Sequence, residues 1–176
     1  NVYSDVPTQS QKRNSKNDKF LPNTTVLLGD SMLNQLTDKG LSGKNRNVHV
    51  ISQSGARITN IKFELMKIIP KAPSHIILHV ATNNATSDSS RQICDDLLFL
   101  KFLINEKLPQ CKVSISCPIM RLDNSKANLT IKQLNDHLKN LEINIIDNDN
   151  IKDYHLSRKG LHLNQRGGGG DNLLPT

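Results

Sequence analysis

Short apolar runs alternate with longer segments of helical spacing from residue 24 onward, and this alternation limits the fold more than any other feature of the chain. Five runs are nearly continuous in apolar or β-branched residues, which is typical of strands covered on both faces of a sheet. They are 25–28, 48–51, 76–80, 113–117 and 143–146. We therefore expect a sheet of about five buried strands.

Three of the intervening segments carry apolar stripes at helical spacing. The stripes consist of Ile58, Ile61, Leu65 and Ile68, of Ile93, Leu97, Leu100 and Ile104, and of Ile131, Leu134, Leu138 and Leu141. Strands that alternate with helices form right-handed βαβ units and a parallel sheet. The predicted fold class is α/β: a three-layer α/β/α sandwich around a flavodoxin-like parallel five-stranded sheet.

Length and composition agree with one α/β domain. The chain has 176 residues, of which 36% are hydrophobic. Residues 1–22 are interpreted as a flexible polar lead-in, 23–167 as the folded domain, and 168–176 as a Gly-rich, truncated tail. The apolar runs are far shorter than a membrane span, so we expect a soluble protein that does not enter a membrane.

The net charge of +7 raises the question of nucleic-acid binding. The segments 1–20 and 151–176 each hold four Lys/Arg and two Asp, and the remaining +3 is spread over the rest of the chain. This distribution favours a basic solvated surface over a nucleic-acid stripe. Nucleic acid therefore stays open only as a weakly supported partner.

Cysteine usage suggests neither a metal centre nor a disulfide framework. Cys94, Cys111 and Cys117 form no CxxC pair and no zinc-type spacing with histidine. We interpret them as buried free thiols in a reducing compartment. Because no apolar signal segment is visible either, an intracellular location is favoured, and no metal or cofactor is expected.

Polar residues that could perform chemistry follow the predicted strands, where parallel sheets bind ligands. Ser31 follows the first strand, Gly55 the second and Asn83 the third, and His162 lies near the carboxyl end. Each has a simpler explanation alone: a helix N-cap, a turn glycine, a turn asparagine and a surface histidine. Together they supply what acyl transfer needs, namely a nucleophile, a base, and donors for the oxyanion.

In these blocks the chain resembles the SGNH or GDSL-type hydrolases, from about residue 26 to residue 167. The similar segments are Gly29-Asp30-Ser31, Gly55, Ala81-Thr82-Asn83-Asn84 and Leu161-His162-Leu163-Asn164. The resemblance implies an esterase that cleaves a carboxylic ester or acetyl group of a small substrate. It also implies that Ser31 attacks and His162 acts as base, while the oxyanion is held by the N–H groups of Ser31 and Gly55 and by the Asn83 side chain. More particularly, the chain is similar to esterase-type domains of animal genomes, some of them associated with retrotransposon open reading frames.

Four positions depart from the family's blocks, and Lys159 matters most, because it stands where the family has the acid that orients the histidine. A lysine cannot accept the Nδ1–H bond of the imidazole. Met32, Ala81 and Asn84 replace the usual Leu, Gly and Asp.

The supporting residues named by the sequence are Asp30, Asn84 and Asp153, of which Asp153 is the carboxylate nearest to His162 in the chain. Two alternatives to an active enzyme stay open: a catalytically impaired interaction module with this fold, and a transposon-derived accessory domain with weak nucleic-acid affinity.

Overall fold

The structure is a computed structural model that describes residues 19–158, 160 and 162–164. Most of the predicted lead-in 1–22, the whole tail 168–176 and Lys159 lie outside the described residues. None of the described helices is long and apolar enough to cross a bilayer.

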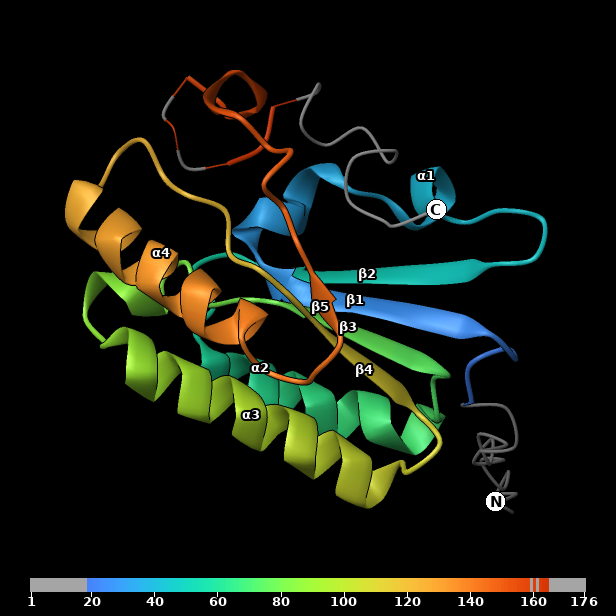
Figure 1. Ribbon diagram of the computed structural model, residues 1–176. Coiled ribbons are helices and arrows are strands. Elements are labelled where there is room, and N and C mark those ends of the chain that lie inside the picture. The colour runs from blue at the N-terminus through green and yellow to red at the C-terminus, as the bar shows by residue number, and fades with distance from the viewer. Residues whose placement is uncertain (1–18, 159, 161, 165–176) are drawn as a thin grey trace, which may run out of the picture.

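The centre of the molecule is a five-stranded parallel sheet of order β2-β1-β3-β4-β5 (Figure 1). The strands are β1 (Thr24–Asp30), β2 (Asn47–Gln53), β3 (His75–His79), β4 (Lys112–Ser116) and β5 (Ile145–Ile146). This order confirms the predicted flavodoxin-like sheet. The fifth strand is shorter than predicted, because only two residues of the run 143–146 pair with β4.

Three long helices cover one face of the sheet (Figure 1). They are α2 (Ile58–Ile68), α3 (Ser90–Lys107) and α4 (Ser125–Lys139). Each contains a predicted apolar stripe, and the stripes pack on alternate strand residues such as Val26, Leu28 and Ile76 to form the larger core. Leu141, the last member of the third stripe, lies beyond the end of α4.

The opposite face is covered by shorter elements. They are η2 (Ser31–Gln35), α1 (Asp38–Leu41) and the carboxyl-terminal loop with η5 (Asp153–His155). Two further 3-10 helices, η3 (Ile69–Lys71) and η4 (Asn84–Thr86), lie elsewhere in the chain. Leu27, Ile77 and Leu156 belong to the second apolar cluster on this face. The segment after Ser31 is a 3-10 helix that ends before Leu36.

Close packing of β1 against β3 requires a glycine at position 29, just before Asp30 and Ser31. Gly29 pairs in register with Ser52 of β2 and with His79 of β3. A Cβ atom on Gly29 would lie 1.9 Å from the backbone oxygen of His79. Only glycine fits there, so the chain reaches Asp30 and Ser31 with its backbone tight against the neighbouring strand.

Candidate active site

Ser31 begins η2 directly after the carboxyl end of β1 and is 8% exposed. The N-cap of this short helix is Asp30, whose Oδ1 accepts a hydrogen bond from the Met32 N–H at 3.0 Å. Asp30 therefore satisfies the helix start, and the alternative explanation of Ser31 as an N-cap is not needed.

Gly55 and Asn83 lie on loops that a hydrogen bond joins. Gly55 has φ 69, the left-handed region that glycine enters without strain, and lies in an exposed turn after β2. The Nδ2 of half-buried Asn83 donates to the Ala56 backbone oxygen at 3.0 Å. Because an asparagine amide has two N–H groups, one stays available to a ligand while the other holds the loop that contains Gly55.

The side chain of Asn84 links this region to α2 and to Asp88 by hydrogen bonds. Its Oδ1 accepts from the Ile58 N–H at the start of α2, at 3.0 Å, and its Nδ2 donates to Asp88 at 2.6 Å. Arg57 pairs with the same carboxylate at 2.7 Å. Burial disfavours the charge of Asp88, but hydrogen bonds from Asn84, Ser87 and Arg57 outweigh burial and hold its pKa below the ordinary value.

His162 lies in a small hairpin of the carboxyl-terminal loop. Leu156 and Leu163 form an antiparallel bridge, and the His162 backbone oxygen accepts from the Ser157 N–H at 2.6 Å. The side chain of Asn164 donates to the backbone oxygens of Tyr154 and Leu156. The hairpin therefore holds the His162 backbone in place.

The structure does not bring the predicted residues into one hydrogen-bonded chain. Among the described residues, no hydrogen bond joins the side chains of Ser31 and His162, and the buried Nδ1 of His162 has no hydrogen-bond partner. Asp153 is exposed at the start of η5 and lines a pocket of about 560 Å³ with Leu122 and Lys152. It makes no hydrogen bond with the His162 Nδ1 atom.

An ion pair between a buried arginine and an exposed aspartate, which the sequence analysis missed, lies after β4. Arg121, 8% exposed, donates to both carboxylate oxygens of Asp123, with Nε to Oδ1 at 2.8 Å and Nη2 to Oδ2 at 2.7 Å. Its Nη1 donates to the Thr82 backbone oxygen at 3.4 Å, so Arg121 also contacts the loop that contains Asn83. Extending the strand-end rule from the first three strands to β4 would have drawn attention to this pair.

This ion pair interacts electrostatically with two predicted site residues. The hydrogen bonds from Arg121 chiefly lower the pKa of Asp123, and the charge of His162 lowers it further. The hydrogen bond to Asp123 raises the pKa of Arg121, and the charge of Asp30 acts in the same direction.

A second network that the sequence analysis missed joins His79 of β3, Ser116 of β4 and Asn148 after β5. His79 Nδ1 contacts Ser116 Oγ at 2.9 Å, and Asn148 Nδ2 donates to the same oxygen. Burial lowers the pKa of His79, and the nearby Asp30 opposes this effect without cancelling it. His79 is therefore a neutral imidazole that belongs to a buried polar network close enough to Asp30 to feel its charge.

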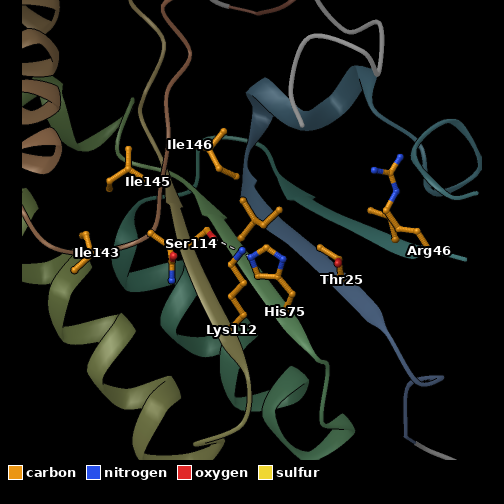
Figure 2. A pocket seen from close by; sticks show the side chains of 11 residues that line it. Thr25, Arg46, His75, Lys112, Ser114, Ile143, Ile145 and Ile146 are labelled. Atoms are coloured by element: carbon orange, nitrogen blue, oxygen red, sulfur yellow. Dashed lines mark hydrogen bonds between the residues drawn. The ribbon is translucent and has the colours of Figure 1, made fainter. Parts of the chain in front are cut away.

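A pocket of about 530 Å³ lies away from this edge (Figure 2). It is lined by residues at the starts of strands, among them Thr25, His75 and Lys112, and by Ser114, which contacts His75 Nε2 at 2.9 Å. Strand starts lie at the amino end of a parallel sheet, so this pocket is separate from Ser31. Among the residues with a described position, no group of three His, Cys, Asp or Glu side chains could hold a metal ion.

Comparisons with known proteins agree on the fold. No family model and no curated protein matches the sequence. A solved structure from Veillonella parvula DSM 2008, described as a member of the lipolytic protein G-D-S-L family, is 20% identical; the match covers 82% of this chain and 91% of that one, with a TM-score of 0.67. The lipase/acylhydrolase from Enterococcus faecalis is 17% identical over 83% and 89%, with a TM-score of 0.64.

A third structure, an acetyl esterase variant with an acetate ion, is 16% identical over 82% of this chain and 90% of that one, with a TM-score of 0.64. The chain therefore has the α/β fold of the GDSL-type lipolytic proteins. Ser31, Gly55 and Asn83 follow three neighbouring strands of it.

Proposed function

We propose that this protein is a serine hydrolase that cleaves a carboxylic ester or acetyl group of a small substrate. The observation that carries the proposal is the position of Ser31, which follows an N-cap supplied by Asp30 at the carboxyl end of the central strand β1. Its hydroxyl has no capping role there, and ligands of parallel sheets bind at this edge.

In this mechanism the Ser31 Oγ attacks the carbonyl carbon of the ester while the Oγ–H proton passes to His162 Nε2. The carbonyl oxygen becomes an oxyanion that accepts hydrogen bonds from the N–H groups of Ser31 and Gly55 and from the Asn83 amide. When the C–O bond to the alcohol breaks, the alcohol takes the proton from His162. Water then attacks the acyl-serine in the same way and releases the acid.

Two features support the donor set. The bond from Asn83 to the Ala56 backbone oxygen holds the second and third loops together, and Asn84 holds the start of α2 behind them. Donors fixed before the reaction contribute more than donors that must reorganise. The lipase/acylhydrolase and acetyl esterase with the same fold act on the proposed class of bond.

The test is hydrolysis of p-nitrophenyl acetate by the purified protein. We expect Ser31→Ala and His162→Ala to lower kcat by at least about 10³-fold. Ser125→Ala and His137→Ala, two exposed positions on α4, are matched controls that retain the parent rate. Activity that survives Ser31→Ala would overturn the mechanism.

Lys159 favours one other candidate, a module that kept the fold but not the activity, because a lysine replaces the family's acid. A parent protein that hydrolyses no short-chain ester would favour this candidate. Weak, salt-sensitive retention on a polyanionic resin would extend it to nucleic acid.

A further inference from the structure

The acid partner of His162 is the part of the proposed hydrolytic site that the sequence leaves empty. In serine hydrolases a carboxylate accepts the Nδ1–H bond of the histidine, fixes its tautomer and stabilises the imidazolium that forms. Here the Nδ1 atom of His162 is buried and has no hydrogen-bond partner among the described residues. A buried polar atom without a partner is costly, which indicates that a group reaches it during the reaction.

The loop after β4 packs directly on the loop of His162. The Leu122 N–H donates to the Gly160 backbone oxygen at 2.8 Å. Gly160 has φ 67, and a Cβ there would lie 2.3 Å from the Leu122 Cβ atom. The two loops therefore meet backbone to backbone, with Asp123 one residue after this contact and His162 two residues after it.

Asp123 is also held ready for such a role. Arg121 binds both of its oxygens, and the backbone of Arg121 is tied to the Asn128 side chain at the start of α4 by two hydrogen bonds. A carboxylate has about four lone-pair sites, so the two bonds from Arg121 leave acceptor capacity for an imidazole N–H. The side chain of Asp123 is 35% exposed, which leaves it room to move toward the histidine.

We propose that Asp123, held by Arg121, is the carboxylate that orients His162 and stabilises its imidazolium form, in place of the acid that the family carries at the position of Lys159. This inference rests on the proposed ester hydrolysis. Asp123 acts through His162 and not on the substrate, so it is a positioning residue. The electrostatic influence of His162 on Asp123 supports their proximity.

The competing carboxylate is Asp153. It is closer to His162 in sequence and, like Asp123, exposed, but it lies at the start of η5 and lines the pocket beside Lys152. The charged groups that the structure places around the proposed pair are Arg121 beside Asp123, and Asp30 at the end of β1, which acts on Arg121. Asp30 accepts the cap bond from Met32 with Oδ1, and its buried Oδ2 has no hydrogen-bond partner among the described residues.

The test compares kcat and the pH profile of kcat/KM for the parent, Asp123→Asn, Asp153→Asn, and Asp136→Asn as an exposed control on α4. We expect Asp123→Asn to lower kcat by about 10²-fold or more, as loss of the orienting carboxylate does in other serine hydrolases. We also expect the acid side of its pH profile to move to lower pH, because a negative charge near the base is lost. A fall confined to Asp153→Asn would overturn the proposal.

A double-mutant cycle separates this role from a structural one. In the His162→Ala background, Asp123→Asn is expected to cause no further loss, because residues that act as a unit are not additive. A further loss of the same size in that background would overturn the proposal. If Asp123→Asn does not fold, Asp123→Glu decides, since it keeps the charge pair with Arg121. A displaced carboxylate should then lower kcat about tenfold or more, and an unchanged kcat would overturn the proposal.

The outcome is distinguishable from a failure of the proposed function. A parent protein without Ser31-dependent hydrolysis overturns both. Ser31-dependent hydrolysis that Asp123→Asn leaves within threefold of the parent rate overturns the role of Asp123 alone.

Discussion

The backbone of Ala81 is strained, because an alanine stands where the similar GDSL-type sequences have a glycine. Ala81, where the GDSL-type block has glycine, has φ 111 and is fully buried two residues after the end of β3. A non-glycine residue in such a conformation costs about 1–3 kcal/mol and persists only where its surroundings enforce it. Here the surroundings are the larger core, in which Ala81 is buried, and the hydrogen bond from Asn83 to the Ala56 backbone oxygen in the same loop region.

Ala81→Gly is therefore expected to leave the free energy of unfolding unchanged or to raise it by up to about 1 kcal/mol, since relief of strain offsets the lost methyl burial and the added chain entropy. Urea unfolding of the variant measures this. Ala85→Gly, buried without a left-handed φ, is the matched control and should lose about 1 kcal/mol. An equal loss at both positions would contradict the assignment of strain.

A second residue-scale prediction concerns the exchange of Asp for Asn at position 84. Asn84 donates to Asp88, so Asn84→Asp would set two carboxylates against each other at a buried site. We expect a loss of roughly 1–3 kcal/mol in the free energy of unfolding. Asn84→Asp combined with Asp88→Asn should recover part of this loss. A double variant less stable than Asn84→Asp would contradict the account.

Among the structural elements, contacts between the loop after β4 and the carboxyl-terminal hairpin determine the geometry of the site more than contacts between the long helices do. Gly160 allows the carboxyl-terminal hairpin to touch the loop after β4. Gly160→Ala would force Leu122 and the hairpin apart. We expect kcat for ester hydrolysis to fall about tenfold or more, because small displacements of reacting groups are costly, with a stability loss of about 1–3 kcal/mol.

Gly43→Ala is the control for that variant, because a Cβ at Gly43 meets nothing within 4 Å. Both proteins are assayed for p-nitrophenyl acetate hydrolysis and for thermal unfolding. If Gly160→Ala retains the parent kcat, the contact between the two loops does not position His162.

The helices and strands differ in how clearly the sequence predicts them. Buried parallel strands are apolar on both faces, so β1, β3 and β4 are visible as nearly continuous runs, and the stripes of α2 and α3 have a clear helical period. The 3-10 helix after Ser31 has no such period, and β5 is too short to be delimited. The proximity of Asp123 to His162 joins loops about 40 residues apart, and no local pattern encodes that contact.

Two histidines on one face of the sheet govern the response of the whole molecule to acid. On β3, His75 lies two residues before Ile77 and His79 two residues after it, so the two histidines are on the same face. His75 contacts Ser114 of β4, and His79 contacts Ser116 of β4. Burial and then the charge of Lys112 lower the pKa of His75 to about 4. Burial likewise lowers the pKa of His79.

A histidine whose pKa is lower in the folded state binds its proton more readily in the unfolded chain. The contribution of these two histidines to the free energy of unfolding should therefore be constant above about pH 6.5 and fall as the pH drops from about 6.5 toward about 4. Asp88 and Asp123, whose pKa values are lowered, weaken the fold only at still lower pH.

Urea midpoints at pH 7 and pH 4.5 measure this decline. We expect His75→Gln to reduce the difference between the two midpoints, while His137→Gln, at an exposed position, leaves it unchanged. Equal midpoints of the parent protein at the two pH values would contradict the role of the buried histidines.

The activation of Ser31 is the central claim, and covalent labelling by an organophosphonate ester followed by peptide mass analysis tests it most directly, because labelling requires an activated hydroxyl. The account predicts one adduct per chain on the peptide that contains Ser31, lost in His162→Ala and retained in Ser125→Ala. A parent protein without an adduct, or with its adduct on another residue, would contradict the account.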